Sequence, residues 1–227
     1  IKMNVTAKSE HSSLTKQDVN WFLFDETLWV TKYKEYMQID DSIAYSMGSF
    51  NWLYESNDTV LFHKKDARFE TAVIGLSARI ELGFADKYIN YICKGKMGNL
   101  YYAENKNIDF VFSPAFIYDE NQDLLLSFPD NFSHKKDYVL FITEDFGFVI
   151  IDYQLKGWVL QRASRHVCIH RERNMGITPH MIARYLSALD VWEKEEEMTE
   201  LESLLAACKQ EGGVFYEALK ECMMNLI

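Results

Sequence analysis

The chain has 227 residues, which is enough for one large domain or two closely joined ones. Hydrophobic residues make up 48% of it and aromatic residues 15%, and this composition excludes an intrinsically disordered protein. Asp and Glu number 34 against 24 Lys and Arg, so the formal net charge of −10 argues against non-specific binding to nucleic acid and to anionic membranes.

The N-terminal region is predicted to be a polar arm followed by a helix. Residues 1–14 are mostly polar and are expected to be flexible. Thr15, with Asp18 three positions later, is typical of a helix N-cap with an acidic first turn, so a helix is expected within 16–37. The apolar run 21–24 is equally compatible with a short strand, and this alternative stays open.

The central part of the chain has the pattern of a β-sheet, because short aromatic and β-branched runs alternate with turn sequences. The predicted strands are Ile43–Tyr54, Thr59–His63, Thr71–Leu82, Tyr88–Cys93, Leu100–Ala103, Asp109–Phe112 and Leu124–Phe128. Three further runs follow, at Tyr138–Thr143, Phe148–Tyr153 and Trp158–Leu160. The turns between these last three are so short that the strands can pair only antiparallel, which predicts a meander.

The C-terminal region is predicted to be helical. Thr178 at the N-cap and Pro179 at the first helical position are a strong start signal, and apolar residues then recur at helical spacing. Thr199 and Glu202 form a capping box for a second helix. Gly212-Gly213 ends that helix before a last apolar segment.

Together these elements predict an α+β fold with an antiparallel sheet of the meander type, a C-terminal helical hairpin or trio, and a possible N-terminal helix. We divide the chain into a flexible arm (1–14), a mainly β domain that begins with the N-terminal helix (15–176), and C-terminal helices packed on the same domain (177–227).

The cysteines and the hydropathy pattern favour an intracellular protein. Cys93, Cys168, Cys208 and Cys222 lie far apart and form no C-x-x-C pair, which indicates free thiols in a reducing compartment. No apolar run reaches the ~18–20 residues of a membrane span, and the first residues lack the apolar core of a signal peptide. We expect a cytoplasmic location and no membrane binding.

A cluster of basic residues between 162 and 173 stands out in this acidic chain. Guanidinium groups bind carboxylate and phosphate through paired hydrogen bonds, so the cluster predicts an anion-binding site. The alternative is structural, with the cluster paired to the acidic C-terminal helices. The candidate anion-binding residues are Arg162, Arg165, Arg171 and Arg173.

The same segment contains a weak zinc pattern. On a strand, His166, Cys168 and His170 would share one face, and imidazole and thiolate are zinc ligands. Three alternating residues on one strand span roughly 13 Å, which is too wide for one ion unless the strand bends.

An acidic run follows the first C-terminal helix. It would bind a basic patch on a partner protein, pair with the basic cluster, or simply form a solvated turn. The residues of this run taken as the partner-binding candidates are Asp190, Glu193, Glu195, Glu196, Glu197 and Glu200.

A second chemical pattern lies in the predicted meander. Glu144-Asp145, followed by Gln154-x-Lys156, resembles the PD-(D/E)-x-K pattern of metal-dependent nucleases, in which acids hold the metal ion and the lysine steadies the attacking water. Gln154 stands where that pattern has its second acid, unless Asp152 substitutes.

The sequence contains no P-loop, nucleophile elbow or zinc-protease motif. We therefore predict an acidic protein-binding module, such as an inhibitor or immunity-type protein that masks a basic partner. The alternative is a small-molecule or anion-binding domain, or a hydrolytic enzyme, that uses the cluster from Arg162 to Arg173. The oligomeric state stays open.

Overall fold

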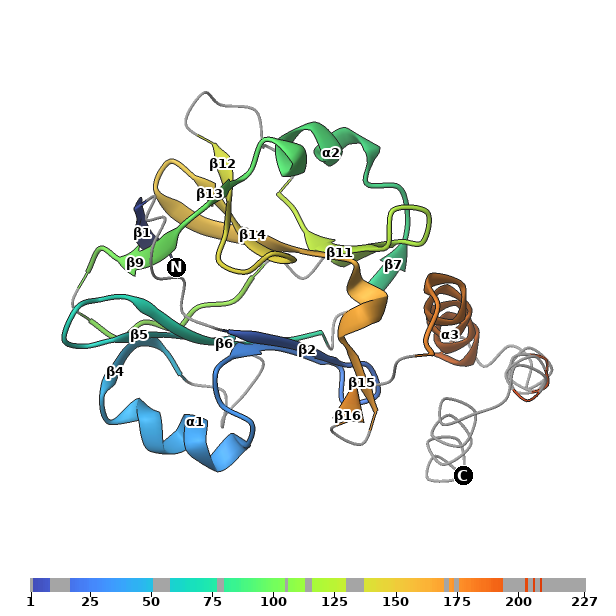
Figure 1. Cartoon of the computed structure of the whole chain (residues 1–227), viewed down its shortest axis with the longest axis horizontal. Helices are drawn as coiled ribbons and strands as arrows, with labels where there is room; N and C mark the ends of the chain where they lie inside the picture. Colours follow the sequence, from blue (N-terminus) through green and yellow to red (C-terminus); the bar gives the residue numbers. More distant parts are fainter. Residues whose placement is uncertain are drawn as a thin grey trace.

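The computed structural model describes residues 2–8, 17–50, 58–76, 80–104, 106–112, 116–129, 137–169, 172–173 and 176–193, and the single positions 203, 206 and 209. These residues form two β-sheets that pack face to face (Figure 1). Helix α1 (Tyr36–Ile43) covers the outer side of one sheet and α2 (Asp86–Cys93) that of the other, while α3 (Pro179–Glu193) lies beside one end of the sandwich.

The larger sheet has nine strands within the described residues. Seven of them follow the order β7 (Ile80–Leu82), β10 (Phe116–Asp119), β11 (Leu124–Ser127), β14 (Gln154–Gln161), β13 (Phe146–Ile151), β12 (Tyr138–Phe141) and β8 (Lys96–Met97). The other two are β1 (Met3–Lys8), which pairs with β14, and β9 (Asn99–Tyr102), which pairs with β1. The outer pairs β7–β10 and β12–β8 are parallel, so the sheet is mixed.

The smaller sheet is also mixed. Its strand order is β16 (Glu172–Arg173), β15 (Val167–Ile169), β2 (Asp18–Phe22), β3 (Thr27–Thr31), β6 (Phe69–Gly75), β5 (Thr59–His63) and β4 (Ser46–Ser49). Only β15 and β2 run parallel among these pairs. A short helix, η2 (Ala163–His166), joins β14 of the larger sheet to β15 of the smaller one.

Aromatic side chains from both sheets form the main core. Trp21 of β2 packs on Tyr118 of β10 with ring centroids 5.8 Å apart. Phe69 of β6 packs edge-on against Phe148 of β13 at 5.2 Å. Such pairs add about 0.5–1.5 kcal/mol each beyond the burial of their apolar area, so these contacts hold the two sheets together.

A second core lies on the outer face of the larger sheet. Tyr88 of α2 stacks on Phe128 at 4.4 Å, and alternate residues of β13 and β14, such as Val149 and Val159, are buried beneath the helix. Both faces of this sheet are therefore covered, and every residue of β13 is buried.

The predicted fold class is wrong. The structure contains two mixed sheets and helices at separate places, instead of one antiparallel meander with a C-terminal helical hairpin or trio. The three strands β12, β13 and β14 do pair antiparallel, but they form only the centre of a larger sheet. After the sheets the structure describes α3 and, beyond it, three single positions that are also helical, 203, 206 and 209.

The predicted N-terminal helix is also wrong, because residues 18–31 form the hairpin of β2 and β3. Glu26 has a φ of 50° in the turn between them, and this left-handed backbone interrupts a helix. Residues 3–8 of the expected arm form β1. The segment Tyr88–Cys93, expected as a strand, lies in α2.

The start of the C-terminal helix is confirmed. Helix α3 begins at Pro179, and the Met181 N–H donates to Thr178 Oγ1 at 3.3 Å. The buried side of α3 includes Ile182, and Tyr185 packs edge-on against Phe24 at 5.2 Å. Over the described ranges, no helix is both long and apolar enough to span a bilayer.

Gly48 in β4 offers a test of this packing. Its φ is +126°, and a Cβ atom there would lie 2.2 Å from Val60 O. We expect Gly48→Ala to lower the free energy of unfolding by about 3 kcal/mol or more, because both backbone strain and overlap result. Gly75→Ala, where a Cβ meets nothing within 4 Å, should change it by less than about 1 kcal/mol. Urea denaturation measures both, and equal effects would contradict the strand geometry at Gly48.

Candidate functional site

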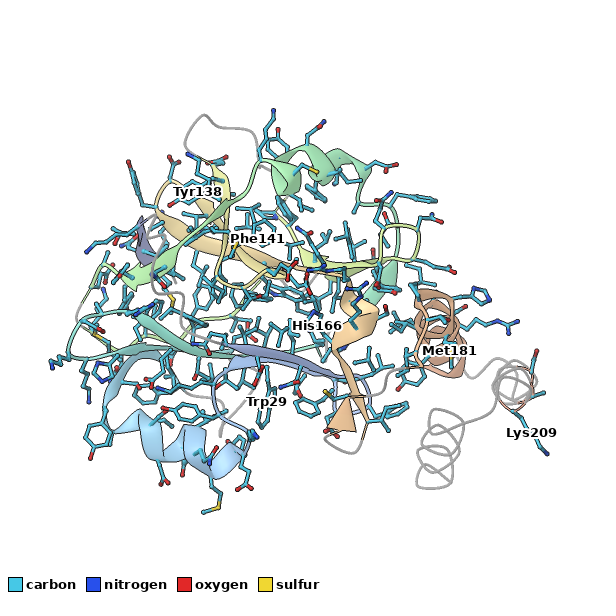
Figure 2. All side chains as sticks on the ribbon, viewed as in Figure 1. Trp29, Tyr138, Phe141, His166, Met181 and Lys209 are labelled. Carbon is cyan, nitrogen blue, oxygen red and sulfur yellow. The ribbon has the colours of Figure 1, made fainter. Side chains whose placement is uncertain are left out.

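The basic cluster begins where the chain crosses from one sheet to the other. Arg162 follows β14 and has a φ of 51°, which turns the backbone out of the larger sheet and into η2. His166 ends η2, and β15 continues in the smaller sheet. The buried side chain of His166 therefore lies between the two sheets (Figure 2).

Asp145, in the turn between β12 and β13, is the carboxylate that binds this cluster. Its Oδ1 accepts a hydrogen bond from Arg162 Nε at 2.6 Å, and Arg162 Nη2 also contacts it. Its Oδ2 lies 2.8 Å from His166 Nε2. Glu144 binds the same guanidinium from the solvent side at 2.9 Å. We call Glu144, Asp145, Arg162 and His166 the junction cluster.

The hydrogen bonds of His166 link two parts of the fold. Its Nδ1 lies 3.1 Å from Val19 O, and its Nε2 lies 2.8 Å from the Asp145 carboxylate. Burial by itself raises the pKa of Asp145, but hydrogen bonds from His166 and Arg162 outweigh it and hold that pKa below its usual range. His166 therefore joins β2 to the turn before β13.

A second carboxylate binds the same crossing. Ser164 donates from its hydroxyl to Asp123 Oδ2 at 2.6 Å and from its N–H to Oδ1 at 2.9 Å. The Tyr118 hydroxyl also donates to Asp123 Oδ1, at 3.1 Å. Ser164 is thus bonded to a carboxylate and not to His166, so these residues do not form the nucleophile–base pair that acyl transfer requires.

The structure describes only some of the other residues of the predicted anion and zinc sites. Arg165 is exposed, and Cys168 is buried with its Sγ 3.4 Å from Asn20 Oδ1. His170 and Arg171 lie outside the described residues, and the backbone alone is described for Arg173. No group of three metal-binding side chains occurs in the part of the chain that the structure describes.

The acidic run predicted to bind a partner is placed only at its start. Asp190 and Glu193 belong to α3, for which the backbone alone is described beyond residue 187. The remaining four candidates, Glu195, Glu196, Glu197 and Glu200, lie outside the described residues. The role of this run stays a prediction.

The nuclease-like pattern does not assemble. Phe146, next to Asp145, pairs with Leu160, whereas Gln154 pairs with Ile151 at the opposite end of the same hairpin. Asp145 and Gln154 are therefore separated by the length of the two strands, and Asp145 already binds Arg162 and His166. One metal ion cannot reach both ends.

A buried carboxylate that the sequence did not reveal lies beneath α1. Glu70 of β6 accepts hydrogen bonds from Tyr33 Oη at 2.7 Å, Lys32 Nζ at 2.9 Å and Ser46 Oγ at 2.9 Å. Burial raises the pKa of Glu70, but these donors together lower it below its ordinary value. Tyr33 precedes α1 and Ser46 follows it, so the hydrogen bonds of Glu70 hold the chain in place at both ends of the helix.

Asp58 is a second carboxylate that the sequence did not reveal. It is 3% exposed and accepts N–H donors from Phe112 at 2.6 Å and Gly75 at 3.0 Å. Burial raises its pKa to about 6, although both backbone donors lower it. Because its donors come from segments far apart in sequence, a local pattern gives no signal for this site or for Glu70.

Comparison with known proteins adds no assignment. The chain matches no protein-family model, no curated protein and no solved structure. The geometry of the described residues is therefore the basis of every functional inference that follows.

The junction cluster is testable by mutation. Asp145→Asn should lower the free energy of unfolding by about 2–4 kcal/mol, because it removes the carboxylate that binds both Arg162 and the buried ring of His166. His166→Gln should cost less in the Asp145→Asn background than in the wild type, because the two side chains interact directly. Glu144→Gln, at an exposed position, should change stability by less than about 0.5 kcal/mol. Additive effects in urea denaturation would contradict the pairing.

The raised pKa of Asp58 predicts a pH dependence. Between pH 4 and 6 the folded protein holds a proton on Asp58 that the unfolded chain releases, so stability falls as pH rises through this window. A shift from 3.8 to about 6 corresponds to about 3 kcal/mol. The Asp58→Asn variant should lose this pH-dependent contribution to stability. A variant with Asp25→Asn, at an exposed position, should keep it. Unfolding free energies of the three proteins across this range check the prediction, and parallel curves for wild type and Asp58→Asn would contradict it.

Proposed function

We propose that the chain is an acidic protein-binding module that masks a basic partner, as an inhibitor or immunity-type protein does. The observation that carries this proposal is that part of the basic cluster is already bound to a carboxylate within the fold. Arg162 and His166 bind Asp145, so two side chains of the cluster are engaged internally, in a chain whose net charge is −10. An acidic surface speeds the encounter with a basic protein and rejects acidic ones.

Exposed apolar side chains also support protein binding. Phe84 is 73% exposed, Met37 71% and Tyr45 70%. Large side chains of this kind serve as anchors in protein interfaces. The alternative, an anion site or hydrolytic enzyme at Arg162–Arg173, has weaker support, because Arg162 and His166 already bind protein carboxylates.

The decisive experiment combines capture with measurement on the purified pair. The full chain, tagged and incubated with a lysate of its source cells, should retain a stoichiometric protein of basic isoelectric point. The affinity of the purified complex should fall steeply as salt increases, because charge pairing is screened. Retention of an acidic partner, or an affinity that salt does not change, would contradict the proposal.

The acidic run gives a more local test. Charge reversal at Glu195, Glu196 and Glu197 should weaken binding of the captured partner by about tenfold or more and reduce its salt dependence. The double variant Asp25→Lys/Glu81→Lys changes two exposed acids elsewhere and should have a smaller effect. Isothermal titration calorimetry measures both, and an unchanged affinity in the first variant would remove this run from the interface.

A further inference from the structure

Helix α1 and Tyr45, which follows its C-cap residue Ala44, present a group of exposed side chains. Met37 and Tyr45 are 71% and 70% exposed, and Asp40 and Asp41 lie between them in sequence and are also exposed. Offsets of three and four residues place Met37, Asp40 and Asp41 on one side of the helix, and Tyr45 is exposed two residues beyond the helix end. The group therefore combines two carboxylates with an apolar side chain at each end. We call these four residues the α1 stripe.

The carboxylates of the stripe are not engaged by the fold. Within the described residues, Asp40 and Asp41 make no hydrogen bond or ion pair. Other acids of the protein, such as Glu70 and Asp145, are bound by two or more donors. Burial raises the pKa of Tyr36 to about 12, and the charge of Asp40 adds to that effect.

The helix beneath the stripe is held firmly in place. Its inner side buries Ile39 and Ser42, and Tyr36 packs against Trp29 of β3 with ring centroids 6.0 Å apart, on the outer face of the smaller sheet (Figure 2). Lys64 donates from its ammonium to Ala44 O at 2.8 Å. Contact with a rigid surface costs less conformational entropy than contact with a mobile one.

Glu70 adds a constraint at both ends of the helix. It binds Lys32 and Tyr33 before α1 and Ser46 after it, and Ser46 also lies 2.8 Å from Ser42 O in the last helical turn. The Tyr45 carbonyl accepts the Lys64 N–H at 2.9 Å. The position of the stripe on the surface is therefore set by a buried network.

From these contacts we infer that the α1 stripe is a docking surface for a basic, amphipathic segment of a partner protein, an inference that rests on the proposed function. Lysine or arginine side chains of the segment pair with Asp40 and Asp41. Apolar side chains of the segment pack on Met37, whose flexible thioether adapts to different shapes, and on Tyr45, whose ring offers contact area at low entropic cost. The sign of the uncommitted charge selects a basic occupant over an acidic one.

The test uses the full chain and a defined probe, a synthetic helical peptide with lysines on one face and leucines on the other. In NMR titrations of isotope-labelled protein, amide shifts should saturate and concentrate at residues 36–45. Asp40→Lys/Asp41→Lys and Met37→Ala/Tyr45→Ala should each raise the Kd by about tenfold or more. A peptide with glutamate in place of lysine should not bind. Thermal unfolding confirms that each variant is folded, since all four side chains are on the surface.

Two controls separate the stripe from general charge attraction. Asp25→Lys/Glu81→Lys makes the same change of net charge and should raise the Kd by less than about threefold. Phe84→Ala removes an aromatic ring outside the α1 stripe that is as exposed as that of Tyr45, and it should leave the Kd unchanged. Equal effects of both charge variants, or shifts concentrated around Leu82 and Phe84, would overturn the α1 assignment while leaving the proposed function intact. Absence of any binding of basic probes or partners would overturn the proposed function as well.

Discussion

The burial of both faces of the larger sheet is the constraint on which the structure depends. One face packs against the smaller sheet through rings such as Trp21, Tyr118 and Phe148, and the other is covered by α2. A sheet that is buried on both sides cannot alternate apolar and polar residues, and its strands become continuous apolar runs. The residues of β13 are all buried for this reason.

This sandwich determines where charged groups can lie. The chain leaves the larger sheet after β14 and enters the smaller one at β15, so residues 162–166 pass between the sheets at one end of the sandwich. A charge in such a place is costly unless it is paired and hydrogen-bonded. Asp145 fulfils this condition for Arg162 and His166, and Asp123 satisfies Ser164. Arg162 and His166 of the basic cluster therefore help to join the two sheets.

Hydrogen bonding within the fold likewise distinguishes acidic residues with a structural role from those on the surface. Glu70, Asp58, Asp123 and Asp145 each bind two or more donors inside the fold. Asp40 and Asp41 lie on the surface of a helix that Glu70 fixes from below. Surface carboxylates such as Asp40 and Asp41 can still pair with an external cation. The exposed side chains of Met37 and Tyr45 place apolar surface near them. The protein-binding role that we propose rests on this contrast more than on net charge.

Local sequence determined those elements whose signals are local. The start of α3 was predictable because an N-cap and a first-turn proline act on the residues next to them, and β5 was predicted within the bounds observed, Thr59–His63, because its run is short and apolar. Antiparallel pairing of β12, β13 and β14 followed from the length of their turns.

Tertiary structure decided the rest. The apolar run 21–24 fits a helix or a short strand equally well, and pairing of β2 with β15 and of β3 with β6 selects the β-structure. Asp145 meets Arg162 across 17 residues, and His166 meets Val19 across 147. No spacing rule encodes such contacts, because they arise only when burial on both faces of a sheet brings distant segments together. The net charge and the basic cluster were visible in the sequence, but the packing of the two sheets decided which of those charges are bound inside the protein and which remain on its surface.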